Sequence, residues 1–220
     1  MRKVGLLVLS LSLLLMSIGI GSAQDNTLIM ARAVDATGLD PHTQTAFASL
    51  RLLELVYEPL VTTDQDLNLA PALATDWAFS EDGLTLTFNL REGVTFHDGS
   101  AFTAEDVIAS FNRILDREVA SAAASNYTSI ESIEAIDDLT VAFNLSIADV
   151  PILSAMASTN AVILSSDVIA NEDPSLVTVG TGPFMLENWT PDDTTTLVAN
   201  DSWWGDGPFI DGIEIRIIPD

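Results

Sequence analysis

The sequence predicts a mixed α/β fold in which an antiparallel sheet packs against helices, and three features support this. Two stretches, 76–90 and 129–145, each run through an acidic turn into a strand whose apolar and polar residues alternate. Such alternation is typical of antiparallel strands with one buried face. Between them, residues 103–115 carry a helix-capping pattern and an apolar stripe at helical spacing. We therefore expect the two hairpins to form one four-stranded antiparallel sheet that the helix covers.

The first 60 residues predict one strand and one helix. Residues 27–33 form a short apolar strand candidate, and a turn-rich segment follows. A helix is expected over 45–58, because apolar residues recur on one face at helical spacing and charged residues on another. Pro59 should end this helix, since proline lacks the backbone N–H that a helix interior needs.

The helix between the two hairpins has the clearest start signal in the chain. Thr103 is the expected N-cap, and Asp106 occupies the third helical position, which is the spacing of a capping box. The apolar stripe that follows consists of Val107, Ile108, Phe111, Ile114 and Leu115. This stripe should face the sheet.

The second half predicts shorter helices and then more strands. One helix is expected near Pro151, a residue suited to a first helical turn, and another at Ser166. Residues 184–199 then form a third hairpin pattern, and 212–218 form a final apolar strand.

Charge and composition exclude several classes of function. Eight basic residues stand against 32 acidic ones, for a net charge of −24, and Lys3 is the only lysine. Such a chain repels phosphate backbones, which excludes nucleic acid as a partner. The absence of cysteine excludes disulfides, thiolate metal sites and cysteine nucleophiles. A saline habitat and ordinary solubility are the two alternative explanations of the acidity.

Residues 1–23 have the organisation of a secretory signal peptide. Arg2 and Lys3 precede an apolar stretch, and small residues at 21–23 fit a cleavage site. A single membrane anchor is the alternative, although the apolar run is short for a span. Because the chain has no cysteine for lipid attachment, we expect a freely soluble, periplasmic mature protein.

No motif assembles a catalytic or metal site, so no catalytic residue, metal ligand or cofactor is expected. His42 and His97 lie beside aspartates in turns, where histidines are usually structural or exposed. The segment 64–75 opens like a calcium loop but lacks the required glycine and final glutamate. The sequence 180–182, Gly-Thr-Gly, is followed by proline instead of the helix that a phosphate-binding turn needs. The G-x-S-x-G nucleophile motif is absent.

Several segments together resemble the family 5 extracellular solute-binding proteins of ABC importers, which serve peptides, nickel and related solutes. Their order and spacing match that family over nearly all of residues 27–220. The segments are Gly38-Leu39-Asp40-Pro41-His42, 55–60 (LVYEPL), 69–74 (LAPALA), 77–107, 180–184 (GTGPF), 200–204 (NDSWW) and 215–220 (IRIIPD).

The resemblance implies a class II periplasmic binding protein of the larger type, with two α/β lobes and an extra α+β subdomain on the first. Residues 24–40 would begin the first lobe, 41–175 would form the extra subdomain with the four-stranded antiparallel sheet, and 176–220 would return to the first lobe. The second lobe is expected to lie outside this sequence. A full-length protein of this kind is expected to be a monomer.

The resemblance also points to ligand contacts. The turn and helix start after the Asp-Pro-His element face the cleft between the lobes in this family, and two further segments can contribute. The expected ligand-binding residues are Gln44, Thr45, Ala46, Phe47, Tyr127 and Asn160. Plain packing is the alternative role for Phe47 and Tyr127. The region around Asn160 lacks the arginine that nickel binders can carry there, which disfavours a nickel chelate.

These features predict a substrate-binding component that captures a peptide or similar small solute and delivers it to ABC permease subunits in the membrane. Alternatives within the family are nickel, opine and oligosaccharide binders, since a shared scaffold does not fix the ligand. From other classes, a secreted hydrolase would need a catalytic constellation, and a structural module would not require these motifs.

Overall fold

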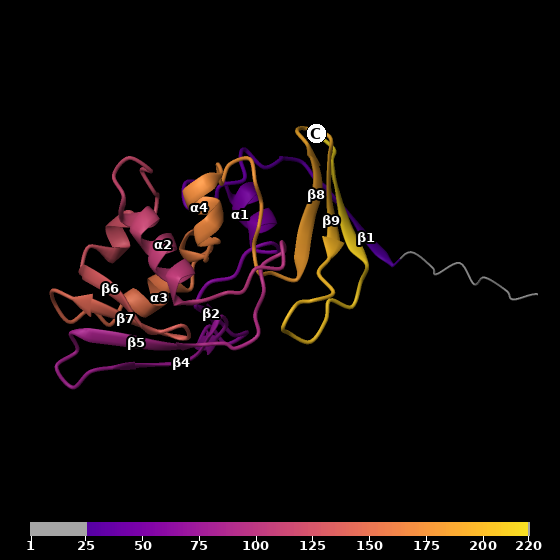
Figure 1. Cartoon of the computed structure of the whole chain (residues 1–220). Helices are drawn as coiled ribbons and strands as arrows, with labels where there is room; N and C mark the ends of the chain where they lie inside the picture. The colour runs from indigo at the N-terminus through magenta and orange to yellow at the C-terminus, as the bar shows by residue number, and fades with distance from the viewer. Residues whose placement is uncertain (1–25, 220) are drawn as a thin grey trace, which may run out of the picture.

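The computed structural model describes residues 26–219, so the predicted signal peptide lies outside the described residues. Its two four-stranded sheets lie at opposite ends of the molecule, with α1 and α4 between them (Figure 1). The strands are β1 (Thr27–Arg32), β2 (Val61–Thr63), β3 (Leu69–Pro71), β4 (Ala74–Phe79), β5 (Thr85–Leu90), β6 (Ile130–Asp137), β7 (Thr140–Leu145), β8 (Phe184–Thr190), β9 (Thr194–Ala199) and β10 (Gly212–Ile217). The helices are α1 (Phe47–Leu53), α2 (Ala104–Leu115), α3 (Ile152–Met156) and α4 (Ser166–Asn171), with 3-10 turns η1 (Ala124–Tyr127) and η2 (Thr159–Ala161).

The first two hairpins form one antiparallel sheet, as predicted, in the order β4-β5-β7-β6. The third strand β7 pairs with β5, so that Leu86 lies opposite Phe143 and Phe88 opposite Val141. One face packs on α2, whose Phe111 ring meets the Phe143 ring edge-on at 5.0 Å between centroids. The predicted stripe on α2 therefore supplies the core of this half.

The capping pattern of α2 is also confirmed and reaches further than the sequence indicated. The Thr103 N–H donates a hydrogen bond to Asp106 Oδ2 at 2.9 Å. The other carboxylate oxygen, Oδ1, accepts the N–H of Ser166 at 2.8 Å. One buried carboxylate thus joins the starts of α2 and α4.

The second four-stranded sheet has the order β1-β10-β9-β8, and β1 runs parallel to β10. The third hairpin and the final strand are confirmed, but the pairing of β1 with β10 joins segments too distant in sequence for local patterns to predict. One face of this sheet is covered by side chains of α1 and of the segment that follows it. The buried cluster includes Leu52, Leu53, Val56, Leu197, Ile213 and Ile215.

Helix α1 is shorter than the predicted 45–58, so that prediction is wrong at both ends. Ala46 has extended backbone geometry and serves as the N-cap. After Leu53 the chain turns tightly, and the Leu55 and Val56 carbonyls accept the N–H groups of Phe184 and Gly182 at 3.0 and 2.9 Å. These hydrogen bonds join the segment after α1 to the start of β8, a contact that helical periodicity does not predict.

The hairpin β2–β3 was not predicted, because strands of three residues carry too little pattern. Its turn is the segment that resembled a calcium loop. Asp64 Oδ1 accepts the backbone N–H groups of Asp66 and Asn68, both at 2.9 Å. The acidic residues here shape a turn. Across residues 26–219, no helix combines the length and apolar character that crossing a membrane requires.

Candidate functional site

Five of the six predicted ligand-binding residues lie close together at the start of α1. Gln44 and Thr45 precede the helix, Ala46 caps it and Phe47 is its first residue. Asn160, in η2, fixes the approach to this helix: its Nδ2 donates to the carbonyls of Pro41 at 2.6 Å and Gln44 at 2.9 Å. The structure therefore gives Asn160 a positioning role behind the four consecutive residues.

Tyr127 is separated from the other five. Its side chain is fully buried in the core under α2, where its ring meets Phe111 edge-on at 5.3 Å. The Tyr127 hydroxyl donates to the Ala155 carbonyl at 2.8 Å. Burial raises the pKa of this hydroxyl well above its usual value. The ring packs against protein on all sides in this structure, and its predicted ligand contact stays a prediction.

Ala46 and Phe47 line a cavity of about 520 Å³, here called the Phe47 hollow. Its other walls come from the end of β1 and the loop after it. The lining residues are Arg32, Ala33, Val34, Asp35, Thr37, Ala46, Phe47, Ala48 and Arg51. Two large apolar side chains stay open to solvent here, Val34 at 66% and Phe47 at 71% exposure. Exposed apolar side chains gathered at one cavity are typical of a ligand-binding groove.

The charged groups of the Phe47 hollow differ in how they are partnered. The Arg51 guanidinium lies 4.9 Å from the centre of the Phe47 ring and forms an ion pair with Glu54 at 2.6 Å. Asp35 Oδ2 accepts the Trp189 indole N–H at 3.0 Å and the Asp192 N–H at 2.9 Å. These bonds hold the rim of the hollow in place.

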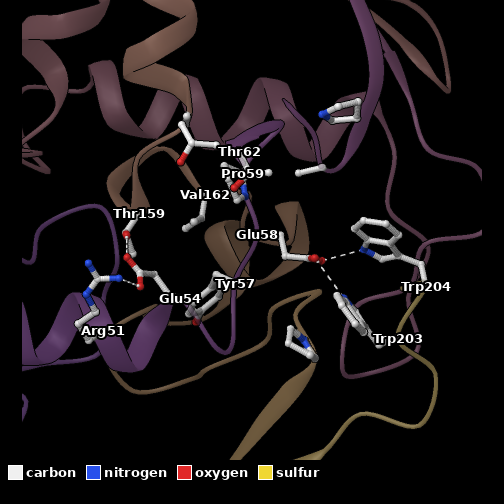
Figure 2. Close-up of a pocket in the computed structure, with 15 residues that line it drawn as sticks. Arg51, Glu54, Tyr57, Glu58, Pro59, Thr62, Thr159, Val162, Trp203 and Trp204 are labelled. Carbon is white, nitrogen blue, oxygen red and sulfur yellow. Dashed lines mark hydrogen bonds and ion pairs between the residues drawn. The ribbon is translucent and has the colours of Figure 1, made fainter. Parts of the chain in front are cut away.

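Arg51 also borders a second cavity of about 490 Å³, the Glu58 hollow. Figure 2 shows Trp203 and Trp204 on one side of it and Arg51, Glu54 and Thr159 on the other. The Glu58 carboxylate accepts both indole N–H groups, Trp203 at 3.1 Å and Trp204 at 2.9 Å. Burial raises the pKa of Glu58, and these two bonds partly oppose the rise. This arrangement ties the segment after β9 to the segment before β2.

The Gly-Thr-Gly segment 180–182 is a site of close packing. A Cβ atom at Gly180 would lie 1.9 Å from the Val56 carbonyl oxygen, so only glycine fits. His97 clamps the segment: its Nδ1 accepts the Gly180 N–H at 3.3 Å and its Nε2 donates to the Gly182 carbonyl at 3.0 Å. This pattern requires the neutral imidazole, and burial lowers its pKa.

The Asp-Pro-His element is likewise an anchor. Asp40 forms a bidentate pair with Arg113 of α2, at 2.6 and 3.0 Å, and both side chains are largely buried. His42 is fully buried, with Nε2 donating to the Val162 carbonyl at 3.0 Å. Burial lowers the pKa of His42 to about 4. Neither histidine belongs to a metal-binding group: no three His, Asp or Glu side chains gather suitably within residues 26–219.

Sequence reasoning missed the residues that border the two hollows from elsewhere in the chain. Trp203 and Trp204 were noted as part of a family segment, but nothing local predicted that they would meet Glu58. Arg32 ends an apolar strand, and its place in the Phe47 hollow depends on how α1 packs over β1. Only the fold reveals such contacts.

Comparison with known proteins identifies the family to which this chain is similar. The sequence model of the family described as "Bacterial extracellular solute-binding proteins, family 5 Middle" matches residues 68–220. The chain is 31% identical to the dipeptide-binding protein of Escherichia coli K12, over its whole length and 46% of that protein.

Two solved structures of bacterial binding proteins share the fold of this chain. The periplasmic binding protein DppA of Helicobacter pylori, in complex with the peptide STSA, matches with a TM-score of 0.78 and 32% identity, over 88% of this chain and 43% of that one. The binding protein AgaA of A. tumefaciens R10, in complex with agropinic acid, matches with a TM-score of 0.83 and 29% identity, over 87% and 40%. The chain thus spans less than half the length of each of these proteins. The chain belongs to the bacterial extracellular solute-binding proteins of family 5.

Proposed function

We propose that this chain is part of the substrate-binding component of an ABC importer. It captures a small solute, most simply a peptide, outside the cytoplasmic membrane and delivers it to permease subunits. The family match and the names of the relatives, a dipeptide-binding protein and a protein with a bound peptide, support this proposal. No catalytic step is assigned to it.

The Phe47 hollow is the observation that carries the proposal. It presents exposed Phe47 and Val34 on a frame whose position is fixed by Asn160 and Asp35. Pre-positioned apolar side chains reduce the ordering cost of binding a small molecule. We assign this hollow as one wall of the solute site, with Gln44, Thr45, Ala46 and Phe47 along its edge.

An opine is the second candidate solute. The structure that supports it is AgaA with its bound agropinic acid, which matches this chain with a TM-score of 0.83. Peptides and opines share a carboxylate next to other polar groups, so the same wall suits both.

The division of the chain follows from this proposal. Residues 24–40 and 176–220 belong to the first lobe, 41–175 form the extra subdomain, and a second lobe closes over the solute. The full-length protein acts as a periplasmic monomer that meets the permease when closed.

Uptake of peptides tests the proposal. Deleting the gene should abolish import of a labelled pool of dipeptides to pentapeptides, and restoring the gene should recover it. Phe47→Asp should restore little, since a charge replaces the apolar wall, whereas Leu176→Asp should restore fully because Leu176 is 78% exposed elsewhere. Unchanged peptide import in the deletion strain would refute the peptide proposal.

A further inference from the structure

Most of the arginines that the structure describes have a carboxylate or an aromatic ring as partner within the fold. Six follow residue 25: Arg32, Arg51, Arg91, Arg113, Arg117 and Arg216. Three of them form ion pairs with carboxylates, namely Arg51, Arg113 and Arg216. Arg91 stacks on the Trp204 ring at 3.9 Å, and Arg117 lies exposed on the surface beyond α2.

Arg32 differs from these. It is the last residue of β1, is partly buried and lines the Phe47 hollow. Its Nη1 donates to the Ala48 carbonyl at 3.4 Å. Among residues 26–219, no carboxylate lies within ion-pair distance of Arg32. A partly buried guanidinium therefore faces the hollow with one long hydrogen bond and no ion pair to a described carboxylate.

The acidic residue nearest to Arg32 in sequence, Asp35, forms its hydrogen bonds with other groups. Asp35 lines the same hollow, but its Oδ1 accepts the Ala36 N–H at 2.7 Å and its Oδ2 accepts two further donors. These three hydrogen bonds fix the loop after β1 against Trp189 of β8 and Asp192 of the β8–β9 turn. Both Asp35 oxygens are thus bonded to donors other than Arg32, which leaves the Arg32 guanidinium available to a ligand.

Such a charge matters in this molecule because its surroundings repel anions. The acidic surface lowers the local concentration of anionic solutes, so a carboxylate can be held only where a specific cation meets it. Arginine suits this role because its planar guanidinium binds both oxygens of a carboxylate. The apolar side chains of Val34 and Phe47 lie in the same hollow and suit an apolar group of the same solute.

We propose that Arg32 binds the terminal carboxylate of the solute, while Val34 and Phe47 contact the apolar side chain next to it. This inference rests on the proposed function and deepens it, because it names the solute class as a peptide with an apolar C-terminal residue. Arg51 stays with Glu54 and positions the Phe47 ring from above.

Titration of the chain with simple probes, followed by ¹H–¹⁵N NMR, tests the inference. N-acetylphenylalanine carries the carboxylate and the ring, its amide lacks the charge, and N-acetylalanine lacks the ring. The acid should shift the signals of residues 32–37 and 46–51 with a Kd on the order of 1 mM, as one open wall allows. The amide and N-acetylalanine should each bind about tenfold more weakly.

Two variants with the same change in net charge make the test specific. Arg32→Gln should remove the preference for the acid over the amide, whereas Arg117→Gln should leave it intact. Arg32→Lys keeps the charge and should retain part of the preference, which decides the case if Arg32→Gln does not fold. Equal binding of acid and amide, or equal losses in the Arg32→Gln and Arg117→Gln variants, would overturn the inference.

The two proposals fail separately. If the acid preference is absent while peptide import still depends on the gene, the Arg32 inference fails and the proposed function stands. If the preference is present but the deletion leaves peptide import unchanged, the peptide-import role fails, and Arg32 remains a carboxylate site for another solute.

Discussion

Phe47 and Tyr127 were predicted to serve the same purpose, yet they lie in opposite environments. The Tyr127 side chain is fully buried and bonded to Ala155, whereas Phe47 is 71% exposed and held by a single stacked arginine. The side chains of the core under α2 are shielded from solvent, whereas the Phe47 hollow presents apolar surface that the described chain does not cover. Burial thus separates an aromatic side chain packed into the core from one that is exposed at the rim of a cavity.

Alanine substitution should measure this difference most strongly. Tyr127→Ala leaves a cavity in a packed core and should lower the free energy of unfolding by about 4 kcal/mol. Phe47→Ala should change it by less than about 0.5 kcal/mol, since little is buried there. Urea unfolding monitored by circular dichroism gives both values. Similar losses for the two variants would contradict the comparison.

The two ion pairs of these regions should differ in the same way. The Asp40–Arg113 pair is largely buried, with side-chain exposures of 8% and 13%, so Arg113→Ala leaves an unpaired buried carboxylate. We expect a loss of about 3–5 kcal/mol. The Arg51–Glu54 pair is open to water, at 52% and 38%, and Arg51→Ala should cost less than about 1 kcal/mol. Denaturant midpoints for the two variants check this order.

Local patterns predicted most of the elements in both regions but few of the contacts between them. Alternation located β5, β7 and the β8–β9 hairpin, and the capping box located α2. The pairing of β1 with β10 and the bonds of Glu58 to Trp203 and Trp204 join residues more than 140 positions apart. No periodicity encodes such contacts, since they form only when segments distant in sequence meet in the fold.

The same limit applies to the candidate site. The segment 44–47 was found through a family resemblance and lies at the Phe47 hollow or beside it. Arg32 was not found, because a single arginine at the end of a strand usually lies in solvent. Its place under α1 follows from tertiary packing alone.

The buried anchors should make stability depend on pH. Burial lowers the pKa of His42 to about 4 in the folded chain. Between pH 6.5 and about pH 4 the unfolded chain therefore binds a proton at this residue and the folded chain does not. Stability should therefore fall across this window, by on the order of 3 kcal/mol in total. His97 acts in the same direction, whereas the raised pKa of Glu58 opposes it.

The His42→Gln variant isolates this effect. It lacks the titrating group, so its unfolding free energy should fall less between pH 7 and pH 4 than that of the parent chain. Chemical unfolding at several pH values supplies the two slopes. Parallel slopes would mean that His42 does not titrate as its burial requires.

Salt should have a smaller effect, spread over the whole surface. The net charge of −24 makes carboxylates repel one another in the compact state, and screening at 0.1 M salt, with a Debye length of about 10 Å, relieves only part of this. The melting temperature should rise by several degrees between low and molar NaCl. A flat or falling melting temperature with added NaCl would mean that repulsion between surface carboxylates does not limit stability.

The most direct test of the open hollow is calorimetric titration of residues 24–220 with a mixed pool of dipeptides to pentapeptides. One wall leaves much of a bound peptide in water, while the ordering costs of binding are still incurred. We predict no binding in the micromolar range, only the weak millimolar contact at Arg32 and Phe47. Micromolar binding by these residues alone would show that they hold a complete site, and would contradict the assignment of the Phe47 hollow as one wall of a larger one.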